Sequence, residues 1–150
     1  MNYKNLLRLE FLSVPENVGV ARVSIAAFTS QLDCTVSQLD DIKGAVSEAV
    51  SNSIIHGYKG EPHHIITITA KLWDDTLEIT VEDTGTGIPD IKRAMQSGYS
   101  TNPERLGLGF SFMRSFMDSV RVESIPGKGT TVTMTKKIFA SSLNNHAYES

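Results

Sequence analysis

The chain has 150 residues, of which 40% are hydrophobic and 21% are charged, and its formal net charge is −3. This length suits a single domain with its own hydrophobic core. The composition excludes a basic nucleic-acid-binding surface, and no apolar run approaches the ~20 residues of a membrane-spanning helix. The N-terminus has charges where a signal peptide is apolar, and Cys34 is the only cysteine. We therefore expect a cytoplasmic protein without an internal disulfide.

The first third of the chain predicts a strand followed by two helices. Residues 4–12 are expected to form the strand, and residues 16–32 form a helix with a broad apolar face. A second helix is expected to begin near Gln38, because Ser37 and Asp40 resemble a capping box.

The middle of the chain predicts a hairpin. Gly57 and Gly60 are expected to end the second helix. Residues 64–73 and 76–83 both alternate apolar and polar side chains, with a tight turn at Asp74–Asp75 between them. One face of this sheet is therefore expected to be buried and the other to meet water.

The second half of the chain begins with a glycine-rich segment, residues 83–109, which predicts a long mobile loop with a short helix near 90–95; such a loop inside a compact domain is usually functional or disordered. A helix over 110–119 follows, and then strands at 120–124 and 130–138.

The element order is β-α-α-β-β-loop-α-β-β, which predicts an α+β two-layer sandwich with a mainly antiparallel sheet packed on helices. Residues 1–140 are expected to form one domain, and residues 141–150 a polar tail.

Glu48 and Asn52 are the first candidate functional pair. They are four residues apart, so both project from one face of the second helix, roughly opposite Val46. Carboxylate and amide oxygens suit Mg²⁺ or a water bound to it, and a carboxylate can also deprotonate a hydroxyl nucleophile. The alternative is a solvated helix face with a local hydrogen bond between the two side chains.

Asp83 is the second candidate, because it ends an apolar strand and is followed by Gly85 and Gly87. A carboxylate in this position can accept a hydrogen bond from an exocyclic amine, and glycines beside it let a flat ring or a phosphate approach the backbone. The alternative is an ordinary strand-to-loop turn, where Asp and Gly are expected in any case.

Gly107 and Gly109 open a predicted helix and form the third candidate. Free N–H groups at a helix start attract anions, and Arg105 can add a charged contact to a phosphate. The alternative is simple capping of the helix.

Familiar motifs of other nucleotide-binding and metal-binding proteins are absent. The chain has no P-loop, no complete dinucleotide-binding glycine motif and no protein-kinase HRD or DFG motif. The spacing of His56, His63 and His64 does not predict a metal site.

The order of the three candidates, a helical E-x-x-x-N, a D-x-G-x-G and a second glycine pair, resembles the ATP-binding domain shared by DNA gyrase, Hsp90, histidine kinases and MutL, the GHKL superfamily. The resemblance spans about residues 5–138. It implies that Asn52 holds Mg²⁺ on ATP, that Asp83 contacts adenine and that Thr130 assists there. The resemblance also implies that four glycines surround the nucleotide and its phosphates, namely Gly85, Gly87, Gly107 and Gly109.

Within that superfamily, the stretches "ARVSIAAFTSQLD", "SEAVSNSIIHGY" and "ERLGLGFSFMRSFMD" resemble the sporulation anti-sigma-F family. This resemblance implies a homodimeric serine kinase that inhibits sigma factor F and phosphorylates an anti-anti-sigma protein. It gives Glu48 the role of general base, Arg105 a phosphate contact and Arg22 a partner contact. A solvated helix arginine is the alternative for Arg22.

Three other functions remain open from the sequence. The first is an anti-sigma-B kinase of the general stress response. The second is a binding module that holds nucleotide without transferring phosphate. The third is the detached catalytic domain of a histidine kinase, although the chain shows no phosphoacceptor helix.

Overall fold

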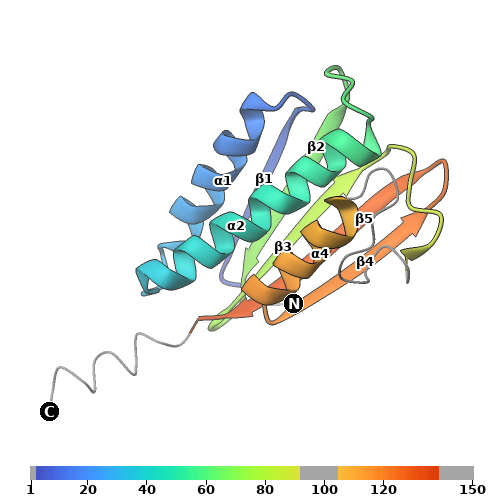
Figure 1. The fold of residues 1–150 in the computed structure, drawn as a ribbon. Coiled ribbons are helices and arrows are strands. Elements are labelled where there is room, and N and C mark those ends of the chain that lie inside the picture. The colour runs from blue at the N-terminus through green and yellow to red at the C-terminus, as the bar shows by residue number, and fades with distance from the viewer. Residues whose placement is uncertain (1–2, 92–104, 139–150) are drawn as a thin grey trace, which may run out of the picture.

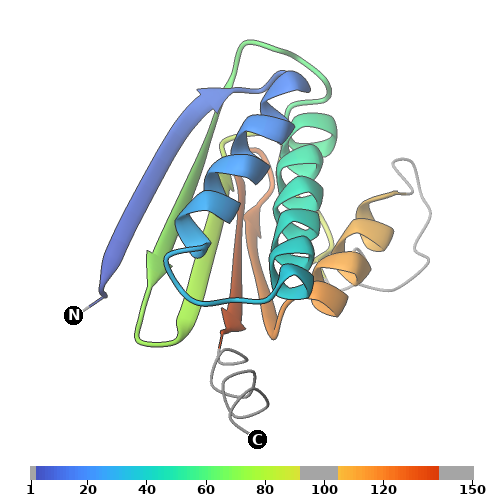
Figure 2. The same cartoon turned by 90° about the vertical axis from the view of Figure 1, so that its left-hand side faces the viewer.

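Five strands form one antiparallel sheet, and the helices cover a single face of it (Figures 1 and 2). The computed structural model describes residues 3–91 and 105–138. The sheet has the order β1-β2-β3-β5-β4, and each neighbouring pair is antiparallel. The strands are β1 (Asn5–Leu12), β2 (Ile65–Leu72), β3 (Thr76–Asp83), β4 (Ser119–Ile125) and β5 (Gly129–Lys137).

The helices lie side by side over the sheet, with α2 between α1 and α4 (Figure 2). Their bounds are Glu16–Thr29 for α1, Val36–Asn52 for α2 and Arg105–Phe116 for α4. A π-helical turn, η1 (Ser53–Gly57), continues α2 without a break. Within the described parts of the chain, none of these helices is long and apolar enough to cross a membrane.

The buried layer between the sheet and the helices confirms the predicted two-layer α+β fold. The inner faces of β2 and β3 are the predicted apolar ones, and the Trp73 amide donates to the Thr76 carbonyl across the predicted turn at 2.9 Å. The largest fully buried side chains include Ile25, Ile42, Ile66, Ile68, Leu77, Ile79, Phe110, Met113 and Met134. This core holds the C-terminal end of α2 next to the end of the sheet where β3 finishes and β5 begins. The candidate site lies at these two ends.

The start of α2 differs from the prediction. The helix begins at Val36, and its cap is Thr35, whose hydroxyl accepts from the Gln38 amide at 3.0 Å. The Gln38 side chain accepts from the Thr35 amide in return, also at 3.0 Å. The predicted box at Ser37 and Asp40 was wrong, because the longer glutamine side chain at the third helical position closes the reciprocal pair with Thr35, two residues earlier.

The start of α4 also differs from the prediction. The helix begins at Arg105 rather than near 110, so the two glycines at 107 and 109 lie inside its first turns. Glycine costs roughly 1 kcal/mol in a helix, but packing of this helix against α2 overrides that preference. The expected helix near 90–95 lies mostly, and the expected tail at 141–150 entirely, outside the described residues.

Gly19 offers a test of local helix stability, because it lies inside α1 where its backbone is ordinary. A Cβ built on Gly19 meets nothing nearer than the Arg22 Nη2 atom at 3.4 Å, which is normal contact. Gly19→Ala is therefore expected to raise the free energy of unfolding by roughly 0.5–1 kcal/mol, measured by urea denaturation. A loss of stability would contradict this placement.

Candidate functional site

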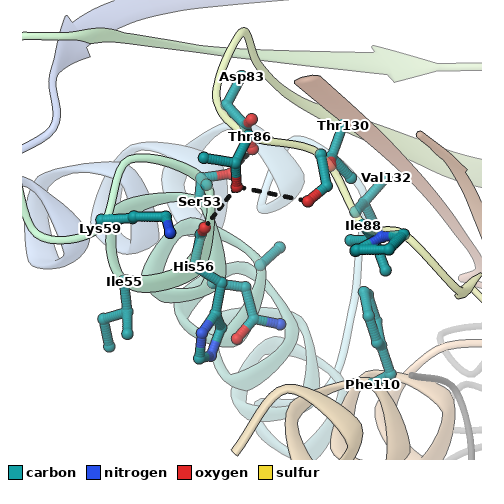
Figure 3. A pocket seen from close by; sticks show the side chains of 15 residues that line it. Ser53, Ile55, His56, Lys59, Asp83, Thr86, Ile88, Phe110, Thr130 and Val132 are labelled. Atoms are coloured by element: carbon teal, nitrogen blue, oxygen red, sulfur yellow. Dashed lines mark hydrogen bonds between the residues drawn. The ribbon is translucent and has the colours of Figure 1, made fainter. Parts of the chain in front are cut away.

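A pocket of about 520 Å³ lies where the end of α2, the loop after β3, the start of α4 and the beginning of β5 meet (Figure 3). This size suits a ligand as large as a nucleotide. Its lining residues include Ala49, Asn52, Ser53, Ile55, His56, Gly57, Lys59, Asp83, Thr86, Gly87, Ile88, Pro89, Phe110, Thr130 and Val132. The walls are mixed, with apolar side chains flanking a few convergent polar groups, as is typical of small-molecule sites.

Asp83 supplies the buried charge of the pocket, because its residue is only 8% exposed. Its carboxylate accepts from the Ser53 hydroxyl at 2.8 Å and from the Gly85 amide at 3.0 Å. Burial raises the pKa of the Asp83 carboxyl, and the hydrogen bonds from Gly85, Ser53 and the Thr130 backbone oppose that rise in part. These bonds orient the carboxylate and leave it able to accept a further donor from a ligand.

The turn η1 brings a glycine directly against this carboxylate. A Cβ built on Gly57 would lie 2.9 Å from both carboxylate oxygens of Asp83. The Gly57 carbonyl accepts from the Thr86 amide at 2.9 Å, and the Thr86 hydroxyl donates to the His56 carbonyl at 3.1 Å. The π-helical turn thus ties the end of α2 to the loop that follows β3, and π-helical turns are frequent at functional sites.

Gly85 packs even more closely, because a Cβ on it would lie 2.1 Å from the Gly57 carbonyl oxygen. Both contacting groups belong to the backbone, so neither can rotate away. Gly85→Ala is expected to lower the free energy of unfolding by about 3 kcal/mol, measured by urea denaturation. Gly19→Ala is the matched control, since the same added methyl group there makes only an ordinary contact with the Arg22 side chain at 3.4 Å, and equal effects of the two substitutions would contradict this close approach.

Glu48 and Asn52 meet α4 at Gly109. A Cβ built on Gly109 would lie 3.0 Å from Asn52 Nδ2, 3.2 Å from Asn52 Oδ1 and 3.2 Å from Glu48 Oε2. The predicted shared face of Glu48 and Asn52 is therefore the face that packs on the first turns of α4. Asn52 lines the pocket, whereas Glu48 lies one turn earlier on α2, outside the pocket's lining.

The amide of Asn52 is chemically suited to a bound ion. Its Nδ2 atom is buried and has no hydrogen-bond partner among the described residues. A buried amide without a partner is costly unless a ligand completes it. The Nδ2 group can donate to a phosphate oxygen, and with the amide turned over, Oδ1 can bind Mg²⁺ or its water. The residues present therefore fit a magnesium-bound phosphate.

Thr130 lies near the start of β5, on the border of the pocket, and it pairs with Asp83 of β3 in the sheet register. Its hydroxyl is hydrogen-bonded to Ser124 Oγ at 2.8 Å, and Ser124 Oγ accepts from the Ile88 amide at 2.7 Å. Gly87 has a φ of +75°, and a Cβ there would lie 2.4 Å from the Ile125 carbonyl oxygen. The predicted residues Asp83, Gly87 and Thr130 thus border one pocket.

Other predicted residues lie elsewhere. Arg22 donates from Nη1 to the Ser47 hydroxyl at 3.1 Å, so its side chain reaches from α1 across to α2. Gly107 and Arg105 belong to the first turn of α4, and the side chain of Arg105 lies outside what the structure describes.

Several pocket residues were missed by the sequence analysis. Ser53 continues the apolar stripe of α2 that includes Ile42, Val46 and Ala49, and the sequence analysis did not single it out, yet its hydroxyl donates to the Asp83 carboxylate. Lys59 lines the pocket with a left-handed φ of 54°, and the Thr86 hydroxyl links the loop after β3 to η1 (Figure 3). A small polar residue within an otherwise apolar stripe is the one signal that could have singled out Ser53.

Comparisons with known proteins agree with this geometry. Residues 11–136 match the model of the histidine kinase-like ATPase domain family. The chain is 53% identical to the anti-sigma F factor of Oceanobacillus iheyensis over 137 residues, covering 90% of this chain and 94% of the relative. It is 50% identical to the anti-sigma F factor of Caldanaerobacter subterraneus over 140 residues, covering 92% and 97%.

Solved structures share the fold at low sequence identity. The structure of the RsbU and RsbW domains of a Mycobacterium tuberculosis protein superposes with a TM-score of 0.66 at 20% identity, covering 90% of this chain and 32% of that one. A blue-light activated histidine kinase of Erythrobacter litoralis gives 0.59 at 19% identity, covering 87% and 43%. With the matching family model and relatives about half identical over nearly their full length, the chain belongs to the histidine kinase-like ATPase domain family and, within it, to the anti-sigma F factors.

Proposed function

We propose that this protein binds and inhibits sigma factor F in the cytoplasm and uses Mg-ATP to phosphorylate a serine of an anti-anti-sigma protein. The names of its relatives support the anti-sigma activity. The observation that carries the enzymatic part is the approach of Gly109 to both Glu48 and Asn52, within 3.2 Å of a built Cβ. This approach brings a carboxylate and an amide of α2 against the first turns of α4, beside the pocket.

Asp83 is the proposed adenine contact at the other end of the pocket. Its carboxylate is already oriented by Ser53 and Gly85, so it costs little reorganisation to accept the exocyclic amine of adenine. A guanine base carries a carbonyl oxygen at the equivalent position, and that acceptor would face a carboxylate. This arrangement favours ATP over GTP as the phosphate donor.

Asn52 and the first turns of α4 are the proposed phosphate end. Backbone N–H groups at a helix start and the helix dipole both favour negative charge, and Gly107 and Gly109 allow close approach. Arg105, at the first position of α4, is proposed as an additional phosphate contact. Mg²⁺, when bound, neutralises charge on the phosphates, and Asn52 is the residue that would hold it.

Glu48 is the proposed general base. It lies beside Gly109, where an incoming serine hydroxyl would meet the phosphates, and its carboxylate would take the proton of that hydroxyl as phosphate is transferred. Arg22 reaches Ser47 from α1, on a different face of α2 from the one on which Glu48 meets α4, so it offers a partner protein a contact separate from the base. We propose that Arg22 contacts that partner and that the protein is a homodimer.

A phosphotransfer assay tests this function. The chain is mixed with Mg-ATP and candidate anti-anti-sigma proteins, and the product is tested for stability in acid. An acid-stable phosphoserine on one of them, together with capture of sigma factor F rather than sigma factor B, is the expected result. An acid-labile product would identify a histidine kinase, and nucleotide binding without transfer would leave only a binding module.

A further inference from the structure

The loop between η1 and β2 gathers three side chains that the nucleotide site does not use. Glu61, His63 and His64 each offer one ligand atom, and these atoms lie within 4.8 Å of one another. The Glu61 Oε1 and His64 Nε2 atoms are 2.9 Å apart, and the two imidazole rings have centroids 4.3 Å apart. The sequence spacing had not predicted a metal site, because a tight turn, rather than a helix or strand period, brings the three groups together.

Hydrogen bonds from Ser13 and a ring contact from Tyr58 hold this loop in place. The fully buried Ser13 donates its hydroxyl to the Glu61 carbonyl at 2.7 Å and accepts from the His64 amide at 3.2 Å. The Ser13 amide also donates to the His64 carbonyl at 2.8 Å. The ring of Tyr58 stacks on the imidazole of His64, with centroids 4.5 Å apart and planes 13° apart. Contacts of this kind orient a ligand before a metal binds.

We propose that Glu61, His63 and His64 form a site for a zinc-type divalent cation. Two imidazole nitrogens and a carboxylate are a common zinc ligand set, with water in the fourth position. Ligand atoms around tetrahedral zinc lie roughly 3.4 Å apart, so small side-chain rotations suffice. The side chains of Glu61 and His64 are 60% and 35% exposed, which leaves them open to both rotation and metal entry.

The ligand set also separates this site from the proposed magnesium position. Imidazole nitrogen suits zinc and related transition metals, whereas Mg²⁺ prefers oxygen ligands and keeps most of its water. Zinc bound here would replace the hydrogen bond between Glu61 Oε1 and His64 Nε2. Saturating Mg²⁺ is therefore expected to leave zinc binding unchanged.

Calorimetric titration of zinc chloride into the untagged, nucleotide-free full chain tests the proposal. We expect one zinc ion per chain and a higher melting temperature with zinc. His63→Ala and Glu61→Gln are each expected to weaken zinc binding at least about tenfold. His146→Ala is the matched control, because it removes a histidine outside the described residues, and it is expected to bind zinc as the wild type does.

Two results would overturn the proposal. One is the absence of zinc binding at micromolar concentrations in the wild type. The other is unchanged zinc affinity in both His63→Ala and Glu61→Gln, which would mean that zinc binds elsewhere. Both substitutions alter exposed side chains, and circular dichroism of each variant distinguishes loss of the site from loss of the fold.

Discussion

Glu48→Gln is expected to slow phosphoryl transfer to the partner's serine by about 10²–10⁴-fold, the usual contribution of a general base. The amide keeps the size of the side chain but cannot accept the hydroxyl proton. Because Glu48 lies beside Gly109 and outside the pocket's lining, nucleotide affinity is expected to stay unchanged. Single-turnover kinetics with labelled ATP measure the transfer step, and calorimetry measures the affinity.

Glu78→Gln is the control for this experiment, since Glu78 lies on β3 with its side chain directed away from the helices. It is expected to transfer phosphate at the wild-type rate. Transfer at an undiminished rate by Glu48→Gln would remove Glu48 from the role of base. A parallel loss of nucleotide affinity would instead indicate that Glu48 holds the magnesium or the phosphates.

Asp83→Asn is expected to weaken ATP binding by about tenfold to a hundredfold, because a hydrogen bond to a charged acceptor contributes roughly 1.5–3 kcal/mol. The free energy of unfolding is expected to stay the same or to rise. The asparagine can keep the bond from the Gly85 amide and a bond with Ser53, and it removes a carboxylate whose burial is unfavourable. Calorimetry and urea denaturation measure the two effects.

The raised pKa of Asp83 also predicts how the difference in stability between the wild type and Asp83→Asn depends on pH. Below the unfolded-state pKa of roughly 3.9, Asp83 is neutral in both states and burial carries no charge penalty. As pH rises from there through the raised folded-state pKa, the wild type loses stability relative to Asp83→Asn. ATP affinity should change the opposite way and weaken as pH falls through the folded-state pKa, because a protonated Asp83 loses an acceptor.

Glu82→Gln is the control for this pair of measurements, because Glu82 neighbours Asp83 in β3 but faces the other side of the sheet. It is expected to change neither ATP affinity nor the pH dependence. Wild-type ATP affinity in Asp83→Asn would contradict the assignment of adenine to this end of the pocket.

The sequence predicted the sheet and helices well, because their apolar patterns are regular. Residues 76–83 form the expected strand without any shift, since alternation and the two-residue turn before it agree. The site was predictable only as separate fragments. Asp83 and Asn52 came from different motifs, and the contact of Gly109 with Glu48 depends on how α4 packs on α2.

The features that the sequence analysis missed depend on local geometry, which the regular spacing of apolar residues does not reveal. The π-helical turn at Ser53–Gly57 brings Gly57 directly against the Asp83 carboxylate, and a regular helical repeat cannot foresee that extra residue. The cap of α2 at Thr35 competed with a similar pattern two residues later. The cluster of Glu61, His63 and His64 forms only because Ser13 and Tyr58 fix the loop.

A crystal structure of the chain with Mg²⁺ and a non-hydrolysable ATP analogue tests the central claim most directly. We predict the adenine amine within hydrogen-bond distance of the Asp83 carboxylate, and the terminal phosphate beside Asn52 and Gly109 with Glu48 facing it from α2. An adenine bound away from Asp83, or a terminal phosphate out of reach of Glu48, would contradict the account.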